Sequence, residues 1–239
     1  MIPERLDLLH RGKAKDVYRT SSEGLLWVHF RDDLTAGDGA KKGREEGKGT
    51  AAGLISAYLF GYLAERGIPT HQVEVVGPRD VVVKALTMVP VEVVVRQVAA
   101  GSLVKRLGLP PGEILPRPLV EWYYKRDDLG DPLLAEDHVL LLNLLTRVEM
   151  ETLRTMALRI FRLLAQRFWK AGLLLVDMKL EFGRHPEEGF LLADEISPDT
   201  CRLWDQATGA SLDKDLFRKG LSPIVPAYRE VLRRLGLEA

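Results

Sequence analysis

Two apolar runs separated by a short polar turn mark residues 172–205. The runs are LLLVDMKLEF and GFLLADEI, and the glycine-bounded turn between them predicts a β-hairpin. In the first run Asp177, Lys179 and Glu181 recur at every second position, so a strand places all three on one face. Charges in strands this apolar are costly to bury unless they bind a metal, a phosphate or each other. A solvated face whose charges lie in water is the alternative.

The remaining pattern predicts short strands and amphipathic helices. Strands are expected at residues 12–20, 25–32, 71–77, 80–86 and 91–98, and helices at residues 50–67, 102–108, 146–171 and 224–236. The first helix is expected to begin with Thr50 as its N-cap and to end at Gly67. Residues 88–90 lie between two strands and include a proline, so we interpret them as a hinge between two lobes.

Two segments lack a periodic pattern. Residues 32–49 are polar and glycine-rich, and a loop this long in a compact domain is usually functional or disordered. Asp38 lies there between two glycines, which let the backbone approach a ligand closely, so we favour a mobile substrate loop over a plain linker. Residues 109–135 are rich in proline and are expected to be irregular.

Composition limits the class of protein. The chain is 46% hydrophobic and 28% charged, which is typical of a soluble globular protein. Lys plus Arg (34) equals Asp plus Glu (34), so no overall basic field favours nucleic acid or a membrane surface. The single cysteine, Cys201, excludes an internal disulfide and a cysteine-based zinc cluster, and is consistent with a reducing cytosol. No apolar run is long enough to span a bilayer, and MIPERLDLLHRGK has no apolar signal core.

Candidate anion-binding groups occur at two turns. Residues 12–15, GKAK, precede a strand, and their backbone N–H and ammonium groups can oppose the charge of nucleotide phosphates. Exposed lysines at a strand entrance are the simpler explanation. Ser102 follows a glycine at a predicted helix start, where free N–H groups, a hydroxyl and the helix dipole suit a phosphate. A plain N-cap role for Ser102 is compatible with this.

Further charges lie within apolar strands. Lys84 is in such a strand, where a buried ammonium group needs a partner. Glu92 and Arg96 share one face of a later strand. They could bind a ligand, or they could form an ion pair with each other.

Several motifs resemble, in order and spacing, those of the SAICAR synthetases, also called phosphoribosylaminoimidazole-succinocarboxamide synthases. The motifs are RGKAKDVY, TAGDGA, KALTMVPVEVVVRQVAAGSLVKRLG, LVDMKLEFG and LLADEISPDTCRLWD, and the resemblance covers almost the whole chain. It implies an α+β, two-lobed ATP-binding fold. The N-terminal lobe, residues 1–88, would be an antiparallel β-rich nucleotide-binding lobe with one main helix. Residues 89–239 would form a larger mixed lobe for substrate and metal. The resemblance also implies a cytoplasmic homodimer.

The implied reaction is an ATP-dependent ligation of purine biosynthesis. ATP activates the carboxylate of carboxyaminoimidazole ribonucleotide (CAIR) as an acyl phosphate, and the amine of L-aspartate attacks it to form an amide. This phosphoryl transfer needs positioning and charge neutralisation, with Mg²⁺, more than a covalent protein nucleophile.

The resemblance implies roles for residues that match the family's motifs. Nucleotide binding falls to Gly12, Lys13, Ala14, Lys15, Lys84, Met88 and Glu92. Substrate binding falls to Arg96, Ser102, Lys125 and Arg202, and metal binding to Glu181 and Asp194. The catalytic set is Asp177, Lys179 and Asp38. Asp177 would be an organiser or the proton acceptor, Lys179 would balance phosphate charge, and Asp38 would lie in a loop that closes over the reacting groups.

Two other functions compete with the ligase. A small-molecule kinase on a similar ATP-binding scaffold would use the lysines and metal carboxylates without needing aspartate. The second competing function is that of a non-catalytic nucleotide- or RNA-binding module. The neutral charge and the lack of interleaved basic and aromatic positions disfavour RNA.

Overall fold

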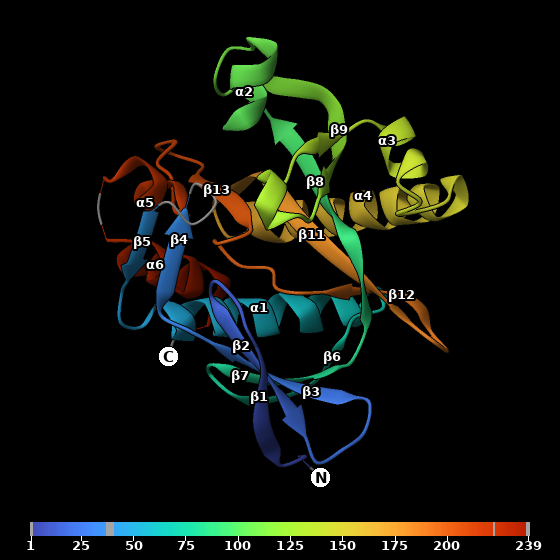
Figure 1. Cartoon of the computed structure of the whole chain (residues 1–239). Helices are drawn as coiled ribbons and strands as arrows, with labels where there is room; N and C mark the ends of the chain where they lie inside the picture. Colours follow the sequence, from blue (N-terminus) through green and yellow to red (C-terminus); the bar gives the residue numbers. More distant parts are fainter. Residues whose placement is uncertain (1, 37–40, 222, 238–239) are drawn as a thin grey trace.

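The computed structural model describes residues 2–36, 41–221 and 223–237. Within these ranges the strands form two large antiparallel sheets, and helix α1 (Lys48–Ala64) lies between them (Figure 1). The five-stranded sheet has the order β1 (Arg5–Arg11), β2 (Lys15–Thr20), β3 (Leu25–Phe30), β7 (Asp80–Lys84), β6 (Gln72–Gly77). The α+β class expected from the sequence is confirmed.

The six-stranded sheet carries the hairpin predicted at residues 172–205. Its order is β10 (Leu133–Leu134), β9 (Ile114–Tyr124), β8 (Thr87–Val98), β11 (Leu173–His185), β12 (Gly189–Ala193), and β13 (Cys201–Asp205) also pairs with β11. In β11, Asp177 is in register with Arg96 of β8 and with Arg202 of β13. Glu181 is in register with Glu92 of β8. Strand pairing therefore brings together charges that are far apart in the sequence.

Helices and a short strand pair complete the described chain. They are β4 (Asp33–Ala36) with β5 (Lys41–Arg44), α2 (Ser102–Leu107), a 3₁₀ turn (Asp127–Leu129), α3 (Glu136–Leu141), α4 (Arg147–Trp169), α5 (Asp215–Lys219) and α6 (Val225–Leu235). Thr146 caps α4 by accepting a hydrogen bond from the backbone N–H of Glu149, whose carboxylate accepts from the N–H of Thr146. This reciprocal capping box explains why the helix begins where the sequence predicted. None of the helices in these ranges combines the length and apolar character needed to cross a membrane.

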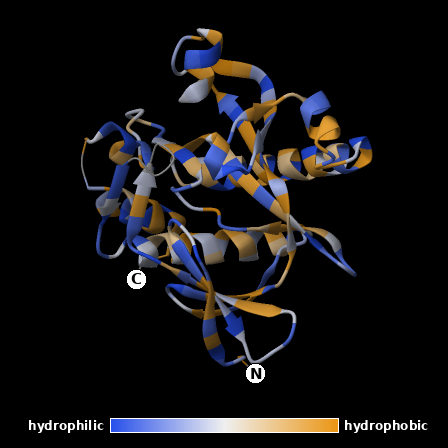
Figure 2. Cartoon of the chain, viewed as in Figure 1, coloured by the Kyte–Doolittle hydropathy of each residue, from blue (hydrophilic) through white to orange (hydrophobic). Residues whose placement is uncertain are grey.

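The main hydrophobic core lies between α1, α4, α6 and one face of the six-stranded sheet. Figure 2 shows many hydrophobic positions along these elements. A smaller cluster joins the other side of α1, through Ala52, to Val28 and Phe30 of β3 and Val81 and Val83 of β7. Helix α1 therefore packs against both sheets and connects them.

Four local expectations are wrong. Residues 32–49 are not one long loop, because β4 and β5 pair with each other and α1 begins at Lys48. Thr50 is not the N-cap, because Gly47 takes that position with φ 90°. The hydroxyl of Thr50 instead accepts a hydrogen bond from Arg79 Nε at 2.7 Å. Residues 88–90 do not separate two strands, since they lie inside the continuous strand β8.

The fourth error concerns residues 109–135, which contain the eleven-residue strand β9. Its partner on the outer side, β10, pairs only with Trp122 and Tyr123. The half of β9 that carries Pro116 and Pro118 is therefore at the sheet edge, where proline is tolerated because an N–H is not needed there. Strand β1 was also not predicted, and its residues are all exposed.

Candidate active site

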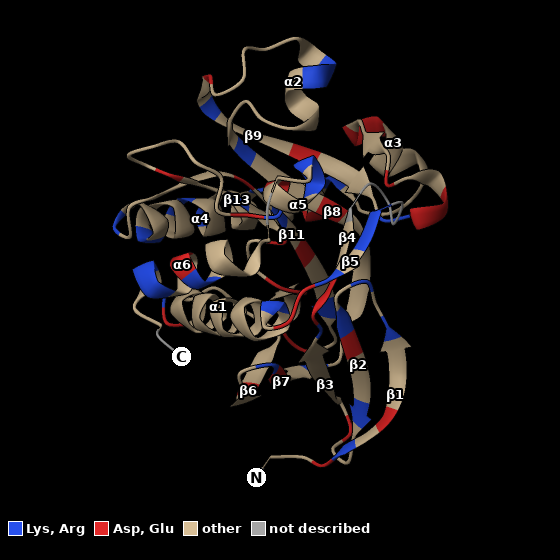
Figure 3. Cartoon of the chain, turned by 90° about the vertical axis from the view of Figure 1, so that its left-hand side faces the viewer, with Lys and Arg blue, Asp and Glu red and all other residues tan. Residues whose placement is uncertain are grey.

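A cleft of about 1170 Å³ lies between the two sheets and collects nearly all the predicted site residues. Those that line it are Gly12, Lys13, Ala14, Lys15, Lys84, Met88, Glu92, Arg96, Lys125, Asp177, Lys179, Glu181, Asp194 and Arg202. Ser102 does not line it, but its hydroxyl accepts a hydrogen bond from Arg96 Nη2 at 3.3 Å. Asp38 lies outside the described residues. Acidic and basic positions recur along β2, β8 and β11 (Figure 3), and residues of all three strands line this cleft.

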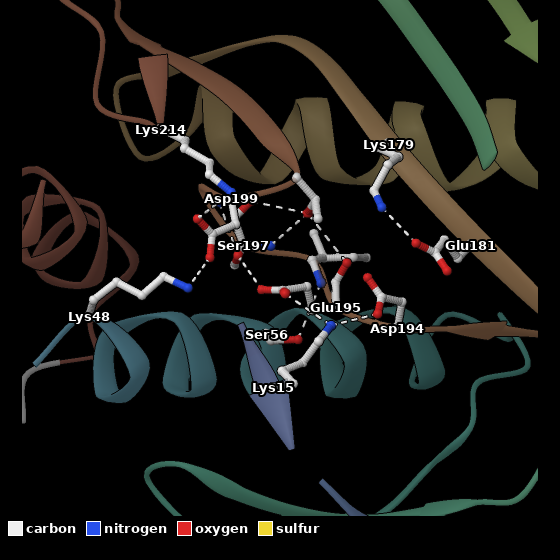
Figure 4. Close-up of polar contacts among 12 residues, drawn as sticks. Lys15, Lys48, Ser56, Lys179, Glu181, Asp194, Glu195, Ser197, Asp199 and Lys214 are labelled. Atoms are coloured by element: carbon white, nitrogen blue, oxygen red, sulfur yellow. Dashed lines mark hydrogen bonds and ion pairs between the residues drawn. The ribbon is translucent and has the colours of Figure 1, made fainter. Parts of the chain in front are cut away.

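The alternating face of β11 forms the first charge cluster. Lys179 Nζ donates to Glu92 Oε1 at 2.8 Å and to Glu181 Oε1 at 2.6 Å, and Lys125 also pairs with Glu181 (Figure 4 shows the Lys179–Glu181 contact). Burial alone would lower the pKa of Lys179, but the charges of Glu181, Asp194 and Glu92 raise it well above the ordinary lysine value. Burial raises the pKa of Glu92, and Lys179 opposes this only in part. The cluster therefore keeps a lysine ammonium charged in the cleft.

Asp194 is the centre of a second cluster, just after β12. Lys15 Nζ of β2 lies 2.5 Å from Asp194 Oδ1 and 2.9 Å from Glu195 Oε1 (Figure 4). Burial alone would raise the pKa of Asp194, but Lys15 and Lys179 lower it well below the ordinary aspartate value. Asp194 has φ 63°, a left-handed conformation that residues other than glycine adopt uncommonly and that often marks functional sites.

Two arginines share one buried carboxylate at the third cluster. Asp177 Oδ2 accepts from Arg96 Nη1 at 2.6 Å and from Arg202 Nη1 at 2.7 Å. Arg96 Nε also donates to Glu121 Oε2 at 2.6 Å, and Arg202 Nε donates to Asp215 Oδ2 at 3.0 Å. Arg96 thus pairs with Asp177 and Glu121 and not with Glu92, which excludes the simple Glu92–Arg96 ion pair for this structure.

An apolar region of the same cleft is formed by Val17, Leu26, Val28, Val83 and Leu86, next to Met88. Gly183 of β11 lies against Leu86 so tightly that a β-carbon there would come within 2.6 Å of the Leu86 β-carbon. This region can take an aromatic ring, whereas the charged clusters can take anions.

Two predicted lysines have partners at the rim of the cleft. Lys84 Nζ lies 2.5 Å from Glu188 in the β11–β12 turn, which supplies the partner that the sequence required. Lys13 Nζ lies 2.8 Å from Asp127 of the 3₁₀ turn. Both pairs are substantially exposed, so they contribute little to stability.

The sequence reasoning missed several residues around these clusters. Glu121 and Asp215 hold the two arginines, and fully buried Lys48 pairs with Asp199, which lines the cleft (Figure 4 shows the Lys48–Asp199 pair). Glu121 stands in the stretch expected to be irregular, so its place on a strand beside Arg96 was not predicted. Asp199 had no local signal, because its partner Lys48 is distant in the sequence. Asp215 has a near partner in Arg218, but its contact with Arg202 depends on the fold.

Comparisons with known proteins agree with this geometry. A family model described as SAICAR synthetase matches residues 8–235. A phosphoribosylaminoimidazole-succinocarboxamide synthase from Bacillus cereus is 48% identical over 233 residues, covering 98% of each chain. The chain belongs to the SAICAR synthetase family. The crystal structure of the Ehrlichia chaffeensis synthase matches with a TM-score of 0.95 and 39% identity, covering 98% of this chain and 100% of that one.

A SAICAR synthetase solved in complex with ADP matches with a TM-score of 0.93 and 44% identity, covering 96% of this chain and 97% of that one. Membership of the family confirms the activity expected from the motifs, an ATP-dependent ligation in purine biosynthesis. It does not favour the kinase alternative.

Proposed function

We propose that the cleft joins L-aspartate to the carboxylate of CAIR through an acyl phosphate, releasing ADP and phosphate. The observation that carries this proposal is that one cleft holds an apolar region, a lysine–carboxylate cluster and a separate arginine pair. These three regions match the three chemical parts of the reaction: a purine base, the phosphates that react, and the phosphate anchor of a ribonucleotide.

In the proposed complex the adenine of ATP binds the apolar region near Met88. Glu92 accepts hydrogen bonds from the ribose hydroxyls. Burial raises the pKa of Glu92, and hydrogen bonds donated to its carboxylate would favour the ionised form. Residues 12–15 and Lys84 cover the phosphates, with Lys15 opposing their negative charge from β2.

The residues present fit a magnesium ion. Glu181 and Asp194 direct carboxylates into the cleft, and three lysines, Lys15, Lys125 and Lys179, neutralise them there. Among the described residues, no three His, Cys, Asp or Glu side chains are grouped as a complete metal site. Mg²⁺ is commonly held by one or two carboxylates together with substrate phosphates, so the two carboxylates suit it. When bound, it would neutralise charge on the transferring phosphoryl group.

The protein's own groups then direct the two chemical steps. Lys179, held charged by its neighbours, stabilises the phosphoryl group as it passes to the carboxylate of CAIR. The product is an acyl phosphate, in which phosphate is a good leaving group. The amine of L-aspartate attacks the acyl carbon, the C–O bond to phosphate breaks, and the proton lost by the amine passes to the released phosphate or to water. No protein nucleophile is required in this scheme.

The arginine pair anchors the ribonucleotide in this proposal. Arg96 and Arg202 present planar donor groups that suit a phosphate, and Ser102 adds a hydroxyl beside Arg96. Asp177 acts as the organiser, because one of its oxygens holds both arginines. For L-aspartate, the candidates are Lys125, the segment that contains Asp38, or both.

We also propose, from the family resemblance, the division into lobes 1–88 and 89–239 and a cytoplasmic homodimer. The change of sheet between Lys84 and Thr87 supports a boundary close to residue 88.

The deciding experiment measures ADP formation with Mg²⁺ and ATP, adding CAIR and L-aspartate separately and together. We expect ADP in step with the amide product only when both are present. ADP formed at the same rate with CAIR alone would point to a kinase or to uncoupled hydrolysis, and ADP without amide would contradict the ligase.

A further inference from the structure

Asp213 carries a fully buried carboxylate close to the arginine pair, and the reaction assigns it no role. Its Oδ2 accepts the backbone N–H of Leu203 at 2.9 Å, and its Oδ1 accepts the backbone N–H of Asp215 at 2.7 Å. Burial raises the pKa of this carboxyl to about 6, so the group is ionised at neutral pH. The two oxygens therefore join strand β13 to the first residue of α5.

The backbone on either side of Asp213 is held as well. The N–H of Leu212 donates to the carbonyl of Leu203 at 2.8 Å, and the N–H of Lys214 donates to the carbonyl of Pro198 at 3.1 Å. The N–H of Asp215, in contrast, is bound by the side chain of Asp213. The placement of Asp215 thus depends on this carboxylate as well as on backbone pairing.

Asp215 in turn orients two arginines that line the cleft. Its Oδ2 accepts from Arg202 Nε at 3.0 Å, and its Oδ1 accepts from Arg218 Nη1 at 2.5 Å. Arg202 Nη1 also donates to Asp177 Oδ2 at 2.7 Å, so carboxylates hold the guanidinium of Arg202 at two of its nitrogens. A shift of Asp215 would release one of these contacts and let the planar group turn.

We propose that Asp213 is a positioning residue for Arg202. Its carboxylate fixes Asp215 against β13, and Asp215 then holds the Arg202 guanidinium in the orientation that binds an anionic ligand. This inference rests on the proposed role of Arg202 in anchoring the ribonucleotide. Asp213 does not touch the ligand in this proposal. An ionised carboxylate suits the role because both of its oxygens accept hydrogen bonds, whereas an amide has one accepting oxygen.

The test measures the Kd of CAIR and the Kd of ADP by calorimetry for the wild type, Asp213→Asn and Asp213→Ser. Asparagine keeps nearly the same volume but replaces one acceptor by an NH₂ group that faces a backbone N–H. Serine is smaller and avoids that clash, and its single hydroxyl replaces the two carboxylate oxygens. We expect both variants to raise the Kd of CAIR roughly tenfold. The Kd of ADP should stay within about twofold, because its region of the cleft lies elsewhere.

Asp205→Asn is the matched control on the same strand. Asp205 Oδ1 accepts the backbone N–H groups of Ala207 at 3.0 Å and Thr208 at 2.7 Å, and its ionic partner is Arg234 of α6. It therefore also holds a turn that follows β13, but it does so without orienting Arg202. Urea unfolding should show a loss of stability in both asparagine variants, and only Asp213→Asn should weaken CAIR binding.

A double-mutant cycle with Arg202→Lys tests whether Asp213 acts through Arg202. If it does, adding Asp213→Asn to Arg202→Lys should change the Kd of CAIR much less than Asp213→Asn changes it in the wild type. A full tenfold effect in the Arg202→Lys background would overturn the positioning role, as would equal weakening of CAIR and ADP.

Arg202→Lys alone separates this inference from the proposed function. If Arg202→Lys weakens CAIR binding and neither Asp213 variant does, the positioning role is wrong and the ribonucleotide anchor stands. If Arg202→Lys leaves CAIR binding unchanged, or the wild type does not bind CAIR, the anchor is wrong and the Asp213 proposal falls with it.

Discussion

The charged residues of β11 are stabilised by one another across strands. Asp177, Lys179 and Glu181 point to one face and find partners on β8, β13 and beyond, so their charges do not remain unpaired in an apolar strand. The solvated-face alternative does not hold for Asp177 and Glu181, which are 4% and 3% exposed.

Glu181→Gln should separate metal use from folding. We expect kcat to fall by about 10²- to 10³-fold, because a neutral amide cannot replace a carboxylate that neutralises the reacting phosphates. ADP binding in EDTA should change little. Steady-state kinetics and calorimetry measure the two effects, and Glu187→Gln at an exposed position of the same hairpin is the control. A Glu181→Gln enzyme with full activity would contradict the metal role.

Arg96→Lys should act on the ribonucleotide and not on ATP. Lysine keeps the charge but loses the planar fork that contacts Asp177, Glu121 and Ser102, so we expect KM for CAIR to rise about tenfold or more. The Kd of ADP should stay within about twofold, since the nucleotide region lies elsewhere in the cleft. Equal weakening of both ligands would argue against a phosphate-anchoring role.

At the scale of elements, α1 shows how packing overrides local signals. The sequence predicted Thr50 as the N-cap of α1. In the structure Gly47 is the N-cap, with a left-handed conformation, and the N–H of Gly49 in the first turn donates to Asp32 Oδ1 at 2.9 Å. The helix therefore begins earlier than predicted. The early start lets the helix backbone at Gly49 approach the main chain of Phe30 and Arg31 closely. A β-carbon at Gly49 would lie 2.6 Å from the Phe30 carbonyl oxygen.

Two glycines of α1 provide a matched test of this close packing. At Gly53 a β-carbon would come within 2.5 Å of the Pro78 carbonyl oxygen, so Gly53→Ala should lower the free energy of unfolding by about 1–3 kcal/mol. At Gly61 nothing lies within 4 Å, so Gly61→Ala should raise it by about 1 kcal/mol through helix propensity. Urea unfolding measures both. Changes of the same sign would contradict the packing explanation.

At the scale of the whole molecule, His71 couples pH to stability because it is buried where the two sheets meet. Burial, with Lys15 adding to it and Asp194 opposing it, lowers the pKa of His71 from 6.5 to about 4. The unfolded chain therefore takes up this proton at a higher pH than the native chain does. The stabilising contribution is complete above pH 6.5 and is lost as the pH falls toward about 4.

This predicts that the free energy of unfolding falls by about 2 kcal/mol between about pH 7.5 and about pH 5 through His71 alone. His71→Gln has no titrating ring and should lose that part of the pH dependence. Urea titrations of the wild type and of His71→Gln over this pH range give the free energy of unfolding of each. Subtracting one from the other cancels the pH dependence of the groups that both proteins share. Identical pH profiles would show that the ring of His71 is not protected from protonation as its burial implies.

The sequence by itself determined the features that follow from local periodicity and motif spacing. Alternation predicted the β11–β12 hairpin with its charged face, helical spacing predicted α4, and the motifs identified the family. These succeed because a side chain's direction depends on its position within one element. Only the tertiary structure decided that residues 88–90 continue a strand, that the proline-rich stretch forms β9, and that Glu121 and Asp215 hold the two arginines of the site. Each of these depends on partners supplied by distant parts of the chain, and pairing energies across such distances leave no periodic signal in the local sequence.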